Sequence, residues 1–211
     1  MPPPPEVNAY RTELDRVLPD DLPHRANVVE MSALHLARMA LVNQHLNLTR
    51  ITEPREAAVK HVLDSVLAWR LFEPYAAIAD IGSGAGFPGV PLALVFPDKR
   101  FLLIESVGKK ARFLGEVDLP NVTVHAVRAE EFLRSARADV LVARAVASCD
   151  KLLQLLRPVL PGRSLLLYKG GDVEAELQEA VAEARRQRRE PRVVLRYELP
   201  DGAGARSMVL V

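Results

Sequence analysis

One segment of the chain combines residue types and spacing that could bind a cofactor: Asp80-Ile81-Gly82-Ser83-Gly84-Ala85-Gly86-Phe87-Pro88-Gly89. An apolar run precedes this segment, and the turn opens a helix. Glycines at every second position allow positive φ and let a ligand approach the main chain closely. The first N–H groups of the following helix lack partners within that helix and can face the same ligand. We therefore interpret the segment as a ligand-binding turn, rather than a plain turn, at the carboxyl end of a strand.

Two classes of cofactor fit this turn. Residues 84–89 satisfy the dinucleotide pattern Gly-x-Gly-x-x-Gly, and Glu105 follows about 20 residues later, as that pattern requires. However, the glycine series already begins at Gly82, and prolines crowd the start of the helix that would hold a pyrophosphate. An acidic residue that ends the next strand is also typical of S-adenosylmethionine-dependent methyltransferases, in which it accepts hydrogen bonds from the ribose hydroxyls. The pattern favours a methyltransferase, and a nicotinamide-dependent oxidoreductase stays open as the alternative.

The surrounding elements predict an α/β fold of the Rossmann-like class. Short apolar runs alternate with helical segments, and the runs occupy residues 78–81, 101–104, 122–127, 139–143 and 164–168. The intervening helical spacing is clearest at 109–117 and 174–189. Strands about 20 residues apart with helices between them indicate βαβ units and a mostly parallel sheet. Two last runs, 193–198 and 207–211, flank Pro200-Asp201-Gly202 and leave no room for a helix, so we expect an antiparallel hairpin.

Residues 1–74 are predicted to form a helical extension packed on a catalytic domain of residues 75–211. Three apolar residues recur at spacings that place them on one face of a helix: Leu34, Ala37 and Leu41. A second helix is expected to start near Thr52, with proline in its first turn and an apolar side formed by Val62, Val66 and Trp69.

Composition excludes several classes of function. The 211 residues include 28 Lys and Arg against 27 Asp and Glu, so the net charge is only +1 and any basic surface must be local. The single cysteine, Cys149, excludes a disulfide framework and a cysteine zinc site. The proline-rich start lacks a signal-peptide pattern, and no apolar run is long enough to span a bilayer. We expect a soluble, cytoplasmic protein without a membrane segment.

Several separate motifs, in order and spacing, resemble the glucose-inhibited division protein B family, the bacterial methyltransferases that modify a guanine N7 in 16S ribosomal RNA. The motifs are Asn47-Leu48-Thr49, His61-Val62-Leu63-Asp64-Ser65, the glycine turn, Glu105-Ser106-Val107-Gly108-Lys109-Lys110, Arg128-Ala129-Glu130-Glu131-Phe132, Ala143-Arg144-Ala145-Val146-Ala147 and Lys169-Gly170. The resemblance covers about residues 43–169. It implies S-adenosylmethionine as cofactor and 16S ribosomal RNA, or a small-subunit ribosomal particle, as partner of an enzyme expected to be a monomer.

The resemblance implies cofactor contacts at Gly82, Phe87, Ala129, Glu130 and Arg144, and the glycine pattern adds Gly84 and Glu105. Gly82 would leave main-chain room beside the methionine part, and Phe87 would form an apolar wall. The pair after the third strand, Ala129 and Glu130, would flank the adenine. Arg144 would end the fourth strand at the edge of the site, where an unpaired charge in an apolar run would be costly.

Guanine N7 carries a lone pair and no proton, so its methylation needs no general base, and the enzyme mainly has to orient the reactants. We expect Arg144 and Lys169 to position the base. His61 and Asp64 share one face of a predicted helix but are too few for a closed metal site. A structural hydrogen bond that ties this helix to the catalytic domain is the preferred interpretation, and no metal is expected.

The RNA-binding surface is predicted around the mouth of the cofactor site. Lys109, Lys110 and Arg112 would bind phosphates on one side, and Lys60 and Arg55 on the other. A denser basic cluster at residues 185–192 is explained equally well by cations that stabilise a helix C-terminus. A non-catalytic RNA-binding module stays as a further alternative, although the intact glycine turn argues against it.

Overall fold

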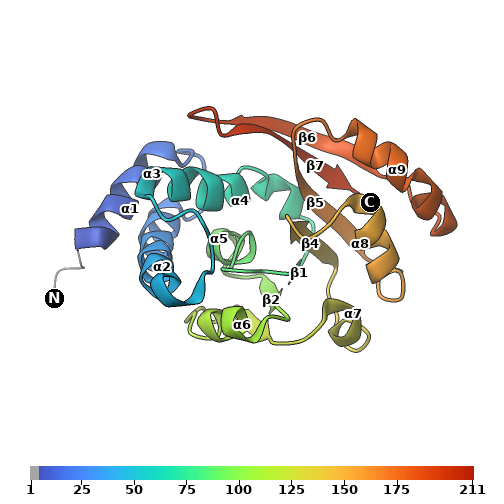
Figure 1. The fold of residues 1–211 in the computed structure, drawn as a ribbon, viewed down its shortest axis with the longest axis horizontal. Helices are drawn as coiled ribbons and strands as arrows, with labels where there is room; N and C mark the ends of the chain where they lie inside the picture. Colours follow the sequence, from blue (N-terminus) through green and yellow to red (C-terminus); the bar gives the residue numbers. More distant parts are fainter. Residues whose placement is uncertain (1–4) are drawn as a thin grey trace.

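Seven strands form one sheet within residues 5–211, the part of the chain that this computed structural model describes (Figure 1). The order is β3-β2-β1-β4-β5-β7-β6, with the first five strands parallel and β7 antiparallel to both of its neighbours. The strands are β1 (Ala77–Ile81), β2 (Arg100–Ile104), β3 (Val122–His125), β4 (Val140–Arg144), β5 (Ser164–Gly170), β6 (Arg192–Leu199) and β7 (Gly204–Leu210). The expected α/β fold with a C-terminal antiparallel hairpin is confirmed.

Helices cover both faces of this sheet. Before β1 lie α1 (Pro5–Val17), α2 (Arg25–Leu46), α3 (Pro54–Ala57), the π-helical η1 (Ala58–Leu63), α4 (Asp64–Val66) and the 3₁₀-helical η2 (Trp69–Phe72). Between the strands lie α5 (Gly89–Val95), α6 (Gly108–Leu114), α7 (Ala129–Phe132), α8 (Cys149–Leu156) and α9 (Glu174–Arg186). In the described part of the chain, no helix is both long and apolar enough to cross a membrane. Residues 1–4, which include most of the proline-rich start, lie outside that part.

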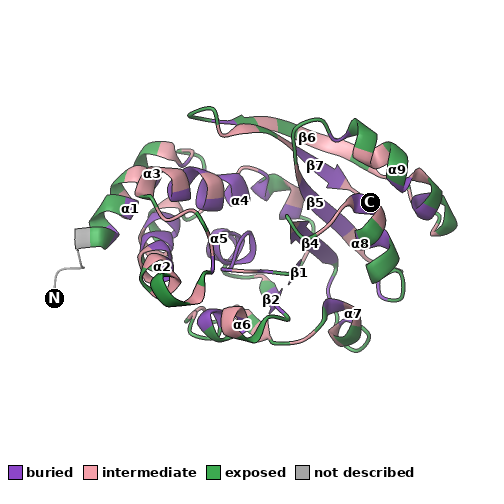
Figure 2. Cartoon of the chain, in the orientation of Figure 1, coloured by how far each residue is buried: buried purple, intermediate pink, exposed green. Residues whose placement is uncertain are grey.

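Side chains of the central strands alternate between two apolar layers, as the period of two in a strand requires. Ile78, Phe101 and Val142 pack with the N-terminal helices, α5 and α6. Ala79 and Leu141 pack with α7, α8 and α9 on the other face. The central strands are buried along most of their length (Figure 2). Because the helices before β1 share a continuous core with the sheet, the division into two domains at residue 74 stays a prediction.

The apolar face of α2 that the sequence spacing predicted is exposed in the structure. Leu34 is 40% exposed and Leu41 64% exposed, whereas Val29, Leu36 and Met39 on the opposite face are buried. Apolar residues occur on both sides of this helix, so the spacing of three and four fits either face. Packing against α1 and α5 decides which face is buried.

The second predicted helix begins at Pro54, and its cap is Glu53 rather than Thr52. The Glu53 carboxylate accepts hydrogen bonds from the main-chain N–H groups of Arg55 and Glu56 at 3.0 and 2.7 Å. Val62 and Val66 are buried as expected. The helix does not continue regularly, because a π-helical turn, η1, interrupts it at residues 58–63.

The hairpin between β6 and β7 turns at Asp201 and Gly202, with φ of 60° and 67°. The N–H of Ala203 donates to the carbonyl of Pro200 at 3.1 Å, which makes this a type I′ turn. Arg55 binds Asp201 at 2.7 Å and so fastens the tip of the hairpin to the helical segment after residue 53 (Figure 1). In the sheet, β7 lies between β5 and β6, and Arg206 pairs opposite Gly170.

Candidate active site

The carboxyl ends of the parallel strands lie side by side at one edge of the sheet. Ile81 of β1 pairs with Ile104 of β2 and with Ala143 of β4, while Arg144 pairs with Tyr168 of β5. The strand order reverses between β1 and β4, which is where α/β sheets bind ligands. The loops that carry most of the predicted cofactor residues all leave the sheet at this edge.

The glycines of the turn have two different structural roles, because Gly84 leaves a surface open and Gly89 allows close packing. Gly82, Gly84 and Gly86 have φ of 67°, 62° and 103°, a region that favours glycine. A Cβ on Gly84 would meet nothing closer than 3.8 Å, so the surface above Gly84 is open. A Cβ on Gly89, by contrast, would lie 2.2 Å from Leu103 Cδ2, which shows that Gly89 lets α5 pack closely on β2.

Glu105 follows β2 and organises the main chain around the turn. Its Oε2 accepts a hydrogen bond from the N–H of Gly84 at 2.9 Å, and its Oε1 accepts one from Val107 at 2.7 Å. The side chain is buried. An ionised carboxylate offers about four lone-pair sites, so Glu105 retains acceptor capacity for ligand hydroxyls.

Asp80 is the last residue but one of β1, and its side chain lies at the start of α5. Its Oδ2 accepts the N–H of Gly89 at 3.0 Å, and within residues 5–211 its buried Oδ1 has no hydrogen-bond partner. Burial raises the pKa of Asp80 to about 7. Since the Asp80 side chain already accepts the N–H of Gly89, the first residue of α5, a pyrophosphate would have to displace it there. This disfavours the dinucleotide interpretation.

The two residues predicted to flank an adenine begin α7, directly after the β3 edge. Ala129 is buried and Glu130 is half-buried. Near them the ring of His125, the last residue of β3, stacks on Phe132 with centroids 3.9 Å apart. The structure thus places Ala129 and Glu130 beyond the same sheet edge as Glu105.

Phe87 joins the glycine turn to the N-terminal helices. Its ring stacks on His61 with centroids 4.5 Å apart and meets the edge of His35 at 5.5 Å. His35 also donates from Nε2 to the carbonyl of Ala85 at 2.7 Å. The ring is therefore enclosed by protein, and its expected contact with the cofactor stays a prediction.

Burial keeps both histidines neutral. It lowers the pKa of His35 to about 4 and, together with the Arg144 guanidinium, lowers that of His61 to about 3. The Nε2 atom of His61 lies 3.2 Å from Thr49 Oγ1 and 3.3 Å from the carbonyl of Ile51. Because a carbonyl only accepts, Nε2 carries the hydrogen.

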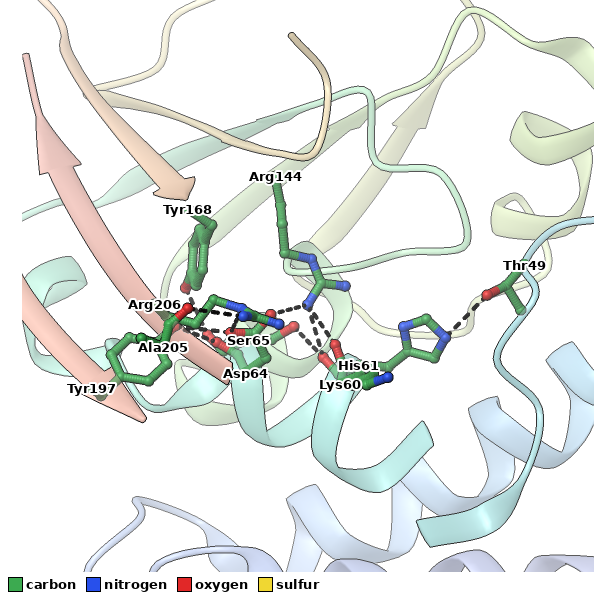
Figure 3. Close-up of polar contacts among 10 residues, drawn as sticks. All are labelled: Thr49, Lys60, His61, Asp64, Ser65, Arg144, Tyr168, Tyr197, Ala205 and Arg206. Carbon is green, nitrogen blue, oxygen red and sulfur yellow. Dashed lines mark hydrogen bonds and ion pairs between the residues drawn. The ribbon is translucent and has the colours of Figure 1, made fainter. Parts of the chain in front are cut away.

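Arg144 is neither a surface arginine nor an unpaired buried charge (Figure 3). Its Nη1 donates to the carbonyls of Lys60 and His61 at 3.0 and 3.4 Å and lies 3.2 Å from Asp64 Oδ2. A π-helical turn leaves carbonyls without their usual i+4 partners, and η1 directs two of them at this guanidinium. Its side chain is 14% exposed at the sheet edge.

Asp64 ties the helical segment to the sheet, as predicted. Besides Arg144, its carboxylate accepts a hydrogen bond from the Tyr197 hydroxyl at 3.0 Å and pairs with Arg206 Nε at 3.3 Å (Figure 3). Tyr168 adds a hydrogen bond to the carbonyl of Ser65 at 2.6 Å. Tyr197 and Arg206 are not among the residues that the sequence motifs indicate. The available signal was that Arg206 shares its strand face with Met208, a core residue, where a charge requires a partner.

Lys169 holds the loop that follows β4. Its Nζ donates to the carbonyl of Ala147 at 2.7 Å and pairs with Glu176 at 2.6 Å. In this loop Ala145 has a φ of 55°, and Val146 Cγ2 lies 2.9 Å from where a Cβ on Gly82 would stand. Val146 therefore covers Gly82, and Lys169 fixes the loop rather than standing free.

A cleft of about 490 Å³ adjoins this loop at the ends of β4 and β5. Polar and charged side chains predominate among its lining residues, which are Ile51, Lys60, His61, Asp64, Arg144, Ala145, Tyr168, Lys169, Gly170 and Arg206. Both residues predicted to position the base, Arg144 and Lys169, line it.

The predicted RNA-binding residues differ in their surroundings. Lys109, Lys110 and Arg112 lie together on α6, and in the described part of the chain none of them forms an ion pair. Lys60 instead pairs with Glu56 at 2.7 Å, and Arg55 pairs with Asp201 and with Glu13. The positive charges of Lys60 and Arg55, which form the second side of the predicted RNA-binding surface, are thus largely neutralised by carboxylates.

In the basic cluster after residue 184, Arg189 donates to the carbonyls of Val211, Leu160 and Arg163 at 3.0, 2.6 and 2.9 Å. Arg186 pairs with Glu183 at 3.2 Å. These contacts give Arg186 and Arg189 structural roles, although the carbonyls that Arg189 binds lie outside α9.

Comparison with known proteins gives one consistent result. The family model GidB, described as rRNA small subunit methyltransferase G, matches residues 30–199. The ribosomal RNA small subunit methyltransferase G of Solibacter usitatus is 51% identical over 205 residues, which cover 95% of this chain and 98% of the relative. The protein of that name from Sorangium cellulosum is 43% identical over 166 residues, covering 74% of this chain and 70% of its own.

Solved structures share the fold at low sequence identity. A ribosomal protein L11 methylase from Lactobacillus delbrueckii subsp. bulgaricus has a TM-score of 0.53 at 12% identity, covering 70% of this chain and 76% of its own. Human N-acetylserotonin methyltransferase, in complex with SAM, has a TM-score of 0.52 at 12% identity and covers 97% of this chain and 66% of its own.

Proposed function

Because the chain belongs to the GidB family, the rRNA small subunit methyltransferases G, we propose that it transfers the methyl group of S-adenosylmethionine to N7 of a guanine in 16S ribosomal RNA. The observation that carries this proposal is the joint placement of the open glycine turn, Glu105 and Arg144 at the switch point of the sheet. The chain is an enzyme, and S-adenosylmethionine is its methyl donor.

The residues at the sheet edge fit this cofactor. No side chain fills the space above Gly84, and Glu105 retains lone pairs for two ribose hydroxyls. Ala129 and Glu130 are proposed to flank the adenine, and Gly82 and Phe87 to lie by the methionine part. When bound, S-adenosylmethionine supplies an electrophilic methyl group on a positively charged sulfur.

The chain's own residues mainly orient the acceptor. Guanine N7 needs no proton removed, so proximity and alignment supply most of the rate enhancement. Within residues 5–211, all hydrogen bonds of the Arg144 guanidinium use Nη1, which leaves the N–H groups of Nε and Nη2 available to a nucleotide in the cleft. Arg144 is proposed to position the base directly, and Lys169 to do so by holding the loop at 145–148.

Incubation of purified protein with radiolabelled S-adenosylmethionine and unmodified 16S ribosomal RNA, free or in small subunits, tests the proposal. We expect label in N7-methylguanosine, and we expect S-adenosylhomocysteine rather than NAD to raise the melting temperature. Unlabelled RNA, in a reaction where a family member run alongside does label it, would overturn the proposal. The same material, run on a sizing column, tests the proposed monomer; a ribosomal substrate implies action in the cytoplasm.

A further inference from the structure

We propose that Arg206, on β7, binds a backbone phosphate of the RNA in the cleft at the ends of β4 and β5. The C-terminal hairpin would thereby help to place the target nucleotide. This inference rests on the proposed function and extends it to a residue outside the motifs that the sequence pointed to.

The position of Arg206 follows from strand pairing. β7 pairs with β5 so that Arg206 stands opposite Gly170, directly after Lys169. A Cβ on Gly170 would lie 3.9 Å from Arg206 Nη1, so the guanidinium lies next to a position without a side chain. Arg206 lines the same cleft as Arg144 and Lys60. Figure 3 draws these three residues together with Asp64.

The charges around Asp64 do not balance. Two arginines, Arg144 and Arg206, share the single carboxylate of Asp64, to which Tyr197 adds a neutral hydroxyl donor. The side chains of Arg144, Arg206 and Asp64 are only 14%, 21% and 6% exposed.

The other charged residues of the cleft do not change this imbalance. Lys60 and Lys169 have carboxylates of their own, Glu56 and Glu176. His61 is neutral, so within residues 5–211 the largely buried Arg144 and Arg206 share one carboxylate at ion-pair distance.

An anion resolves this imbalance, because buried charges are stable mainly when they are paired. A planar guanidinium also binds phosphate through two parallel hydrogen bonds. Arg206 uses Nε for Asp64 and Nη1 for the carbonyl of Ala205, and no contact within residues 5–211 uses its Nη2. The anion that an RNA substrate brings to this cleft is a phosphodiester.

The test is the salt dependence of RNA binding, measured with unmodified ribosomal RNA and S-adenosylhomocysteine for Arg206→Gln and wild type. We expect the variant to bind RNA more weakly and the slope of log K against log salt to fall by about 0.7–0.9, the value of one phosphate contact. Affinity for S-adenosylhomocysteine should stay unchanged. The matched control is Arg196→Gln on the same hairpin, because Arg196 is exposed and pairs with Glu174. This control should behave as wild type.

A wild-type slope in Arg206→Gln would overturn the inference, as would an equal loss in Arg196→Gln. If the glutamine variant does not fold, Arg206→Lys is the second test, because lysine keeps the positive charge but lacks the parallel N–H donors of the planar guanidinium. We expect this variant to bind RNA at least about threefold more weakly than wild type. Wild-type affinity in that variant would also overturn the inference. Failure of the wild-type protein to methylate RNA would instead count against the proposed function. Inorganic phosphate, added at matched ionic strength, should compete with RNA for wild type more than for Arg206→Gln.

Discussion

The guanidinium of Arg144 lies 3.2 Å from the carboxylate of Asp64, across 80 residues of sequence. This ion pair joins the end of β4 to the helical segment before the sheet. Phe87 makes a second connection, since it stacks on His61 of the same segment. The N-terminal helices therefore form one wall of the active site and are more than an appendage that binds RNA.

Asp64→Asn should strongly destabilise the protein, because it leaves two largely buried guanidinium groups without their carboxylate. Breaking a buried ion pair by removing one partner costs about 3–5 kcal/mol of unfolding free energy. Asp21→Asn is the control, since Asp21 pairs with Arg70 on the surface and exposed pairs contribute little. Urea denaturation measures both variants. Equal stability of the two variants would contradict the structural role of Asp64.

Gly89→Ala should reduce both stability and cofactor affinity. Its Cβ would lie 2.2 Å from Leu103 and 2.7 Å from the Asp80 carboxylate, so α5 must move away from the sheet. Overpacking of this kind costs about 1–3 kcal/mol. Gly108→Ala is the control, because a Cβ there would meet nothing within 4 Å. Thermal melting with and without S-adenosylhomocysteine compares them, and a Gly89→Ala variant as stable as Gly108→Ala would count against the packing described.

The pH dependence of stability should reveal the buried histidine beside Phe87. The pKa of His61 falls from 6.5 to about 3 on folding, so the unfolded chain binds more protons between these values. Its contribution is fully present above pH 6.5 and is lost as the pH falls toward 3. His61→Asn should therefore lose stability less steeply than wild type below pH 6.5, although its stability at pH 8 is lower.

The comparison of His61→Asn with wild type cancels the contributions of other groups. Asp80 is the important one, because its pKa is raised to about 7 and its effect has the opposite sign. His45→Asn, at an exposed histidine near the end of α2, serves as control. Parallel curves for wild type and His61→Asn from pH 8 to pH 4 would show that His61 is not buried as a neutral ring.

The basic surface of α6 should bind RNA phosphates. The Lys109→Ala/Lys110→Ala/Arg112→Ala variant should weaken RNA binding and make its salt dependence less steep by about one unit per contact. Cofactor affinity should barely change. Arg185→Ala/Arg188→Ala is the control, because these exposed arginines lie on the far cluster at α9. Loss of RNA binding in the α9 variant alone would place the RNA surface at that cluster.

Much of the fold could be predicted because its signals are local. The central strands β1, β2, β4 and β5 contain short apolar runs, and Pro200-Asp201-Gly202 has the residue types of the turn that it forms. The glycine turn and Glu105 were recognisable because main-chain geometry dictates their residue types.

The remaining features depend on contacts between distant segments. Spacing alone could not choose the buried face of α2, since Leu34 and Met39 fit helical periodicity equally well. The pairing of Arg206 with Asp64 depends on β7 lying beside β5, which no local pattern specifies. The roles of Arg144 and Lys169 were likewise hidden, because their partners, which are main-chain carbonyls and the carboxylates of Asp64 and Glu176, lie on other elements.

The most direct test of the central claim is to map N7-methylguanosine in 16S ribosomal RNA from cells with and without this protein. We expect one guanine whose N7 methylation disappears in the deletion strain and returns with the wild-type chain. A Glu105→Ala chain, which loses the carboxylate that holds Gly84, should restore it poorly. Identical methylation of 16S ribosomal RNA in both strains would show that this protein is not the enzyme that methylates guanine N7.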